Sequence, residues 1–345
     1  MDRAVDETSP LCPSSGDTAG IAWENKSAEE CDFADDAYAA DGRDFSDFRS
    51  GVVAVIGQPN VGKSSLLNKI LKYKLSIVSA KPQTTRDNIL GLYNSEKSQI
   101  LFVDTPGIHK PHNKLGEKLV ERAVSELDEA DVVLYMVSVD AKADSPAEKR
   151  IIGALSKCSV PIVLAVNKVD LPGSRARILP LIASFNDKLT LKDVMPVSAR
   201  DGTNCDALVG LITSLLPPGV PMFPDDMLTD RTERFIAQEV IREKVIAATE
   251  EEVPHSVAVE IDEYKSPDEF PERKNLLIRA TIYVEREGQR LIVLGRKGEK
   301  IKSIGIAARK AIEELTGHKV FLELWVKVNR EWRDSESELR RLGYD

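Results

Sequence analysis

The chain has 345 residues, which is long for a single compact core and suits two domains with an additional tail. Hydrophobic residues make up 42% of the sequence and charged residues 30%, as in globular proteins. No apolar stretch reaches the roughly 20 residues that a membrane-spanning helix needs, so we exclude a membrane-spanning protein. The four cysteines show neither close pairing nor regular spacing, which indicates neither a zinc cluster nor a disulfide framework and fits a reducing compartment.

Residues 1–50 carry the whole excess of negative charge. They hold 13 Asp and Glu against 4 Lys and Arg, which accounts for the net charge of −9. The segment lacks periodic apolar residues, so we predict a disordered acidic tail. It has neither the basic start and apolar run of a secretory signal nor the Arg-rich, acid-poor composition of a transit peptide. A solvating extension is the favoured interpretation, and an acidic interaction arm is the alternative.

Residues 51–216 alternate short apolar runs with segments long enough for helices. Because the runs are apolar at nearly every position, the strands should be buried on both faces. The pattern predicts an α/β domain whose mostly parallel sheet is covered by helices on both sides. The expected strands cover residues 52–56, 99–105, 131–140, 160–170 and 194–199.

Residues 217–227 are rich in proline, which ends the last helix and predicts a stiff linker between domains. Residues 228–345 then read as a smaller α+β domain. We expect a helix over 232–249, strands over 255–264 and 275–286, a GxxG turn, a helix from about 299, and a final strand over 320–328.

The sequence GQPNVGKS at residues 57–64 matches the phosphate-binding loop pattern between a strand and a helix. Its glycines let backbone N–H groups surround phosphate oxygens at a helix N-terminus. Lys63 supplies a positive charge to the outer phosphates, and the Ser64 hydroxyl binds Mg²⁺. The context favours a functional loop over a structural turn. The expected nucleotide contacts here are Gly57, Gln58, Pro59, Asn60, Val61, Gly62, Lys63, Ser64 and Ser65.

The sequence DTPG at residues 104–107 follows an apolar strand about 40 residues after this loop. Asp104 should emerge at the same sheet edge, where its carboxylate can hold Mg²⁺ through water. Alone, DTPG would be an ordinary Asx turn. In this position it predicts a second nucleotide-binding segment, made of Asp104, Thr105, Pro106 and Gly107.

The sequence NKVD at residues 167–170 indicates which base is bound. Asp170 accepts hydrogen bonds only, so it can receive both the ring N–H and the exocyclic amine of guanine, whereas adenine offers no such donor pair. Asn167 and the stem of Lys168 would frame the base. Ser198 and Ala199 follow the next expected strand, where the Ala199 N–H could donate to the guanine oxygen.

The sequence GRKG at residues 295–298 forms a GxxG turn before the expected helix at 299. Glycines at both ends would let a nucleic-acid strand approach the backbone closely. Between residues 286 and 310 there are eight basic and two acidic residues, which favours RNA binding over a merely solvated helix face. Trp325 and Trp332 are candidate stacking platforms, although strand alternation favours core packing for Trp325. The expected RNA contacts are Gly295, Arg296, Lys297, Gly298, Lys300 and Lys302.

Taken together, GxPNVGKS, QTTR, DTPG, NKxD and SA resemble the motifs of the translation-factor-related GTPases. The segment VEREGQRLIVLGRKGEKIKSIGIAARKAIEELTG, followed by LELWVKV, WRD and LRRLGYD, resembles the Era family of bacterial GTPases with a KH domain. The resemblance covers residues 51–345. It implies a P-loop GTPase domain over 51–216, a linker over 217–227 and a type II KH domain over 228–345.

The resemblance also implies roles for single residues. The first switch would span about 76–88, with Thr85 as the Mg²⁺ ligand that senses the γ-phosphate and Thr84 as the fallback. The second switch would begin at Asp104, and the Gly107 N–H would bond the γ-phosphate. The metal ligands would then be Ser64, Thr85 and Asp104.

Hydrolysis should be slow, because Ile108 stands where many GTPases carry a water-orienting glutamine. Asn60 resembles the asparagine that helps to hold K⁺ in potassium-stimulated relatives. The expected catalytic residues are therefore Lys63, Thr85, Gly107 and Asn60. We assign no general base to His109 or His112, because phosphoryl transfer depends on positioning and charge.

The function that the resemblance implies is a GTP-binding and GTP-hydrolysing switch that needs Mg²⁺ and binds small-subunit 16S rRNA. It would assist 30S subunit assembly and rRNA maturation, as a cytoplasmic monomer. The alternative is an RNA-binding module whose nucleotide site is structural and barely hydrolyses GTP. Weak peripheral membrane contact is a further alternative, for which the sequence offers no amphipathic anchor. An RNA-modifying GTPase would need another domain, and no segment is left over for one.

Overall fold

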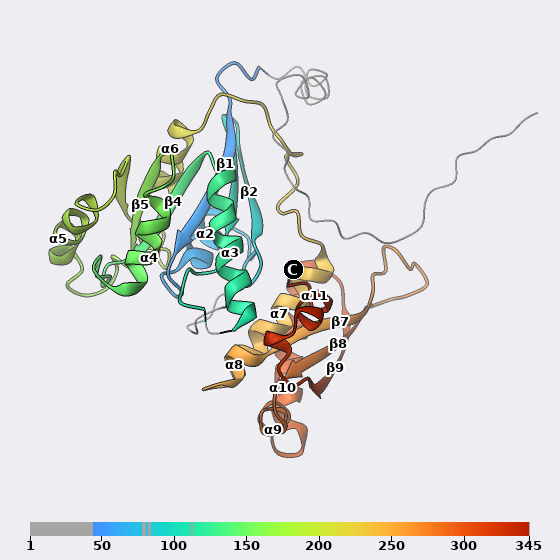
Figure 1. Ribbon diagram of the computed structural model, residues 1–345. Helices are drawn as coiled ribbons and strands as arrows, with labels where there is room; N and C mark the ends of the chain where they lie inside the picture. The colour runs from blue at the N-terminus through green and yellow to red at the C-terminus, as the bar shows by residue number, and fades with distance from the viewer. Residues whose placement is uncertain (1–43, 78–80, 82–83, 112, 345) are drawn as a thin grey trace, which may run out of the picture. The chain divides into compact units, whose positions relative to one another are not determined.

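The computed structural model describes residues 44–77, 81, 84–111 and 113–344. The N-terminal part of these residues forms a six-stranded sheet with helices on both faces (Figure 1). The strand order is β2-β3-β1-β4-β5-β6, in which β2 runs antiparallel to β3 and every other pair is parallel. The strands are β1 (Arg49–Gly57), β2 (Ile89–Ser95), β3 (Ser98–Asp104), β4 (Val132–Ser138), β5 (Ile162–Asn167) and β6 (Asp193–Pro196).

Two apolar clusters line the two faces of this sheet. Val53 of β1 packs in the cluster that includes Leu66 and Ile212, whereas the next residue, Ala54, packs with Leu127 and Phe185 on the other face. Successive strand residues point to opposite faces, so a sheet covered twice requires apolar residues at every position. The predicted α/β architecture is confirmed. The covering helices are α2 (Lys63–Leu71) and α6 (Cys205–Leu215) on one face, and α3 (Lys114–Glu129), α4 (Pro146–Leu155) and α5 (Arg175–Asn186) on the other.

The edges of this unit differ in detail from the sequence expectation. Strand β1 begins at Arg49. The residue before it, Phe48, is buried, and its carbonyl accepts a hydrogen bond from the Gly219 N–H at 3.1 Å. Strand β2 was not expected, because its residues 89–95 fall between the predicted first switch and the next apolar run. The prediction of a disordered tail over residues 1–50 is wrong at its end, because residues 49–50 lie in β1 and Phe48 is buried. Residues 1–43 lie outside the described residues.

The proline-rich segment runs beside the edge of the sheet. The Gln99 side chain accepts hydrogen bonds from the N–H groups of Met222 and Phe223 at 2.6 and 2.9 Å. Farther along, the Leu92 N–H donates to the Leu228 carbonyl at 3.0 Å. Prolines lack a donor but leave their neighbours free to bond, so the segment follows the sheet edge without joining it as a strand.

The C-terminal part contains a second sheet, in the order β7-β8-β9. Strand β7 (Ala258–Lys265) runs antiparallel to β8 (Leu276–Val284), and β9 (Val320–Val328) runs parallel to β8. The even-numbered residues of β9 pack with α7 (Glu233–Ala248) and α10 (Glu299–Thr316) in one core. The remaining elements are α8 (Val253–Ser256), α9 (Glu287–Leu294), the 3₁₀ turns η1 (Arg296–Gly298) and η2 (Trp332–Asp334), and α11 (Glu336–Arg341).

The expected order of elements omitted α9. The apolar run LIVL at 291–294 belongs to this helix, so the GxxG turn joins two helices. A four-residue apolar run is compatible with either element, and only the packing of Val293 into the core decides for a helix here.

Core packing of Trp325 and RNA stacking by Trp332 are both contradicted by the structure, whereas RNA stacking by Trp325 stays a prediction. Trp325 lies on the odd-numbered face of β9, opposite the core, and 44% of it is exposed. Trp332 is fully buried, and its Nε1 donates to the Ser256 carbonyl at 2.9 Å. Alternation along a strand separates two faces but does not tell which face is covered.

In the part of the chain that the structure describes, every helix is too short or too polar to span a bilayer.

Candidate nucleotide and RNA sites

The predicted nucleotide motifs meet at one edge of the first sheet. Strands β1, β3 and β5 are parallel and end at Gly57, Asp104 and Asn167, and β6 ends two residues before Ser198. Parallel strands bring their carboxyl ends to the same edge, where open α/β sheets bind ligands. Four segments that are far apart in the sequence therefore form one site.

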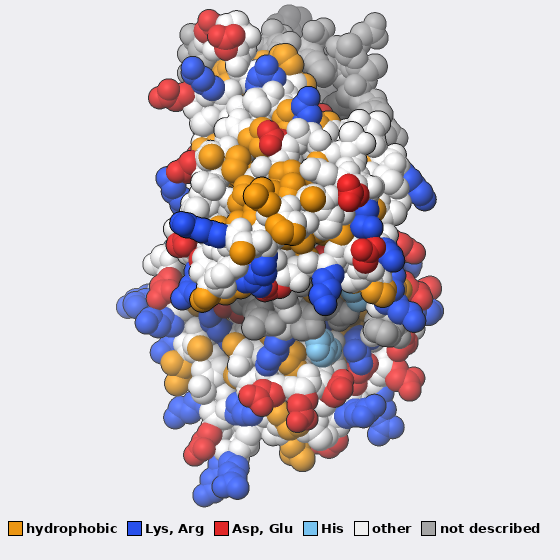
Figure 2. Space-filling view, turned by 90° about the vertical axis from the view of Figure 1, so that its left-hand side faces the viewer, with side chains coloured by type: hydrophobic (Ala, Val, Ile, Leu, Met, Phe, Trp, Pro, Cys, Tyr) orange, Lys and Arg blue, Asp and Glu red, His pale blue; other side chains and the backbone are white. Residues whose placement is uncertain are grey.

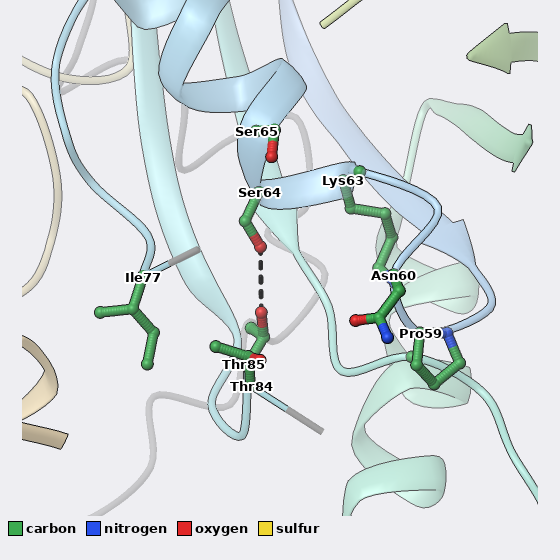
Figure 3. A pocket seen from close by; sticks show the side chains of 10 residues that line it. Pro59, Asn60, Lys63, Ser64, Ser65, Ile77, Thr84 and Thr85 are labelled. Carbon is green, nitrogen blue, oxygen red and sulfur yellow. Dashed lines mark hydrogen bonds between the residues drawn. The ribbon is translucent and has the colours of Figure 1, made fainter. Parts of the chain in front are cut away.

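The phosphate loop lines an open pocket at the N-terminus of α2 (Figure 3). Gly62, which precedes the helix, has a φ of 102°, and a Cβ there would lie 2.4 Å from Asn167 Nδ2. Only glycine fits this close approach in the left-handed region. The free N–H groups of the first helical turn face the pocket, which makes it suited to an anion.

Lys63 lies at the floor of this pocket. Its ammonium group donates to the carbonyls of Gly57 and Gln58 at 3.0 and 3.1 Å. Burial lowers the pKa of Lys63 to about 8, although the nearby carboxylates of Asp104 and Glu148 oppose the shift. A bound phosphate would accept stronger, charge-assisted hydrogen bonds from this ammonium group than the two neutral carbonyls do.

The three predicted metal ligands come together beside the pocket. The Ser64 hydroxyl donates to Asp104 Oδ2 at 2.7 Å and lies 3.0 Å from Thr85 Oγ1 (Figure 3). Asp104 is fully buried, burial raises its pKa, and its Oδ1 has no hydrogen-bond partner among the described residues. Hydroxyl and carboxylate oxygens are the ligands that Mg²⁺ prefers. A bound Mg²⁺ would satisfy the orphaned Oδ1, so the residues present fit this ion.

The structure separates the two candidate threonines. The Thr84 hydroxyl donates to the Lys81 carbonyl at 2.7 Å, whereas the Thr85 hydroxyl faces Ser64. The geometry therefore favours Thr85 over Thr84 as the metal ligand. Residues 78–80 and 82–83 of the predicted first switch lie outside the described residues.

The second predicted switch begins close to the phosphate loop. A Cβ on Gly107 would lie 2.6 Å from the Pro59 nitrogen, so this position requires glycine. The next residue, Ile108, is 3% exposed and packs in the core on the α3 side of the sheet. Its side chain points away from the pocket and cannot orient a water molecule. His109 contacts the Gly107 carbonyl at 2.7 Å, and His112 lies outside the described residues.

The base-recognition segments are held by hydrogen bonds to one another. Asn167 donates to the Val61 carbonyl at 2.7 Å and accepts from the Ala199 N–H at 3.0 Å. This N–H was expected to donate to guanine, and here it bonds Asn167. The Ser198 hydroxyl donates to Asp170 Oδ1 at 2.9 Å. Asn167 therefore joins the phosphate loop to the base-side loop, and Ser198 orients the carboxylate of Asp170.

Sequence reasoning missed one buried pair next to the site. The Tyr135 hydroxyl of β4 donates to the carboxylate of Glu148 in α4, and Glu148 is fully buried. The Gln58 amide lies against the same carboxylate. The only signal in the sequence was an acidic residue in the first turn of a helix, which is too common to single out Glu148.

The GxxG turn presents glycine where the backbone needs it. Gly295 and Gly298 have φ values of 71° and 78°, and a Cβ on Gly295 would lie 2.6 Å from Lys300 Cβ. Arg296, Lys297 and Lys302 are exposed, and the N-terminus of α10 follows the turn. Figure 2 shows Lys and Arg side chains at the lower end of the molecule, the end where α9 lies in Figure 1. The turn therefore offers an open, basic backbone to an anionic strand.

Comparison with known proteins agrees with these sites. Residues 52–168 match the family described as 50S ribosome-binding GTPase, and residues 252–333 match the KH domain family. The GTPase Era of Geotalea daltonii is 47% identical over 298 residues, which span 86% of this chain and 98% of that protein. The chain belongs to the Era family of GTPases. Its predicted family, GTPase domain and KH domain are thereby confirmed.

Two solved Era structures match the fold over the same share of the chain. One holds Era in complex with MgGDPNP and nucleotides 1506–1542 of 16S ribosomal RNA, and the other holds a variant of Aquifex aeolicus Era bound to GDP·AlF₄⁻. Each has a TM-score of 0.82 at 42% identity and covers 86% of this chain and 99% of its own. Like other members of the Era family, this protein is a GTPase.

Proposed function

We propose that this protein is a GTP-hydrolysing switch that binds small-subunit 16S rRNA through its KH domain and assists 30S subunit assembly and rRNA maturation. The observation that carries the proposal is the convergence of Ser64, Thr85 and Asp104 beside the phosphate pocket, in a chain that also presents a basic GxxG turn. The Era complex with MgGDPNP and a 16S rRNA segment supports it, because the two ligands bind one relative together.

In the nucleotide site, Ser64, Thr85 and Asp104 would hold Mg²⁺, which neutralises charge on the β- and γ-phosphate oxygens when bound. Lys63 would exchange its two backbone carbonyls for phosphate oxygens. The Gly107 N–H would donate a hydrogen bond to the γ-phosphate. Hydrolysis removes the γ-phosphate and would therefore release the second switch. Asp170, oriented by Ser198, would select guanine through its two donor groups.

Hydrolysis by this site should be slow without help, because Ile108 packs in the core instead of orienting water. We propose that Asn60, at the exposed rim of the pocket, helps to hold K⁺ beside the phosphates. Phosphate release should then be faster in potassium chloride than in sodium chloride, and Asn60→Ala should remove the difference. Equal rates in the two salts for the unchanged protein would contradict the potassium site.

The buried Ile108 also favours a second candidate, an RNA-binding module whose nucleotide site is structural. Lys63→Ala separates the two functions. A working enzyme loses phosphate release in this variant, whereas a structural site shows the same negligible release before and after the change.

In the KH domain, the GxxG turn and its basic neighbours would grip about four unpaired nucleotides, as KH domains do in general. Phosphate contacts would come from Arg296, Lys297, Lys300 and Lys302, and close approach would be allowed at Gly295 and Gly298. Such contacts supply salt-sensitive affinity, while base edges in the groove supply sequence choice.

Crosslinking to cellular RNA tests the RNA partner. Small-subunit rRNA should be enriched with the unchanged protein and depleted with the double variant Arg296→Ala, Lys297→Ala, whose changes are confined to exposed positions. Without enrichment of small-subunit rRNA, the assembly role fails.

We further propose a monomer that acts in the cytoplasm with 30S particles. Sedimentation of the purified protein should give the mass of one chain, and cell fractionation should find it with small-subunit particles. Co-sedimentation with anionic vesicles would instead favour the alternative of weak peripheral membrane contact.

A further inference from the structure

Arg86 follows directly after the Thr85 of the metal site and reaches into the C-terminal part of the chain. Its side chain is 1% exposed. Nη1 donates to the Val257 carbonyl at 2.7 Å, and Nη2 donates to the His255 carbonyl at 3.2 Å. A residue of the first switch is therefore bonded to the last turn of α8 and to the residue that connects α8 to β7.

Two aromatic rings from the end of the chain surround the same guanidinium group. The carbon at its centre lies 5.6 Å from the ring of Trp332 and 5.7 Å from the ring of Tyr344, distances at which cations are attracted to aromatic faces. The two rings stack with 5.8 Å between their centres. The Tyr344 hydroxyl also accepts from Nη1 at 3.4 Å.

This arrangement is costly for a structural contact alone. Arg86 is buried away from water, its Nε has no hydrogen-bond partner, and no ion pair of Arg86 with a carboxylate is found among the described residues. An apolar side chain of similar volume would avoid the desolvation of a cation, and such replacements often stabilise proteins. The cost indicates that the cation is kept for a task other than stability.

A second arginine holds the other side of Thr85. The buried Arg242 of α7 donates to the Thr84 carbonyl and is fixed by the carboxylate of Glu239. The C-terminal domain thus binds Thr84 through the Arg242 guanidinium, and it binds Arg86 through backbone carbonyls and aromatic rings. The Thr85 hydroxyl remains directed at Ser64.

We propose that Arg86 is a positioning residue that lets the C-terminal domain set the place of Thr85, with Trp332 and Tyr344 as its receptor. Binding of Mg²⁺ and the γ-phosphate favours Thr85 in the observed place, so it also favours the contact between Arg86 and the aromatic pair. Coupling between two sites is reciprocal. If GTP strengthens the contact between Arg86 and the aromatic pair by a given factor, loss of the contact lowers the affinity for GTP relative to GDP by the same factor. The link to RNA binding rests on the function proposed above.

The test compares affinities for GDPNP and GDP in the full-length protein with Mg²⁺. Arg86→Met keeps the apolar volume and removes the cation. We expect about tenfold weaker GDPNP binding, within the 5- to 150-fold range of typical couplings, and unchanged GDP binding, because Thr85 serves the γ-phosphate. The Mg²⁺ concentration that gives half-maximal GDPNP binding should also be higher for Arg86→Met than for the unchanged protein. Equal losses for both nucleotides, or no loss, would overturn the proposal.

Further variants separate positioning from folding. Tyr344→Phe keeps the ring and should behave as the unchanged protein, whereas Tyr344→Ala should lower the GDPNP to GDP affinity ratio as Arg86→Met does. The double variant Arg86→Met, Tyr344→Ala should lower the GDPNP to GDP affinity ratio no more than either single variant, because both changes act through one contact. Additive losses would contradict a shared contact.

Lys114→Ala serves as the matched control. It removes the exposed ion pair between Lys114 and Glu336 of α11, which joins the same parts of the chain but touches no residue near Thr85. Its affinity ratio should stay unchanged. A ratio lowered as much as in Arg86→Met would show that any loss of contact between the two parts has this effect, and would also overturn the proposal.

The RNA arm uses a 3′-terminal 16S rRNA fragment and measures its affinity with GDPNP and with GDP. Any difference seen for the unchanged protein should disappear in Arg86→Met. If the unchanged protein fails to bind this RNA, the proposed function fails, while the nucleotide ratios still decide the role of Arg86.

Discussion

The Tyr135 hydroxyl donates a hydrogen bond to the buried carboxylate of Glu148, directly behind the phosphate loop. The pair joins the centre of the sheet to α4, and the Gln58 amide extends it to the loop itself. The carboxylate of Glu148 also raises the pKa of Lys63 and so opposes the lowering that burial causes. A buried carboxylate in this place therefore supports the phosphate site electrostatically while it loses solvation.

Glu148→Gln should make the protein relatively more stable as the pH rises. Burial is the largest influence on Glu148 and raises its pKa above the ordinary 4.5. Between 4.5 and the raised pKa, the folded state binds more protons than the unfolded state, so this group's contribution to stability falls as the pH increases. The difference in free energy of unfolding between Glu148→Gln and the unchanged protein should move in favour of the variant from pH 4.5 to pH 8.

Urea unfolding at several pH values measures this difference. Glu121→Gln removes the same charge at an exposed position and serves as the control for the substitution itself. A flat difference for Glu148→Gln would refute the argument. Tyr135→Phe should cost about 1–3 kcal/mol, because it leaves the buried carboxyl group of Glu148 with one hydrogen-bond partner fewer.

Asp170→Asn should change the choice of base. In the proposed function the Asp170 carboxylate accepts from two donors of guanine, and an amide would place its own donor against one of them. We expect GTP affinity to fall roughly 10- to 100-fold, in line with about 1–3 kcal/mol for a lost or mismatched hydrogen bond. Xanthosine triphosphate, which carries an oxygen in place of the exocyclic amine, should bind the variant better than GTP does. Competition binding with both nucleotides measures the change, and an unchanged preference for GTP would exclude this role for Asp170.

The sequence could predict that the four motifs meet, because they follow strand ends and parallel strands bring those ends to one edge. Thr85 was preferred as the metal ligand through the family resemblance, with Thr84 as the fallback, and only the folded backbone shows that the Thr85 hydroxyl faces Ser64. Arg86 was part of a quoted motif, yet its role stayed hidden. Its partners His255, Val257 and Tyr344 lie 169 to 258 positions away, and no local pattern reports such contacts.

The two tryptophans should differ sharply in their effect on stability. Trp332→Ala removes a fully buried ring and should cost about 3–5 kcal/mol, as large-to-small core changes do. Trp325→Ala changes a half-exposed residue on the outer face of β9 and should cost well under half of that. Thermal and urea unfolding of the two variants measure both effects. Similar losses would mean that the outer face of β9 is covered after all.

The GxxG turn should bind RNA in a salt-dependent way that can be dissected one cation at a time. The slope of the logarithm of affinity against the logarithm of salt concentration is about −0.7 per phosphate contact for single strands. Lys297→Ala should therefore weaken binding at low salt and reduce the slope by about that amount. Gly298→Asp should weaken binding more, since it adds both a side chain and a negative charge where φ is 78°. Lys142→Ala, far from the turn in the GTPase domain, is the control and should leave the slope unchanged. If Lys297→Ala alters affinity equally at all salt concentrations, Lys297 makes no phosphate contact and the turn grips RNA in another way.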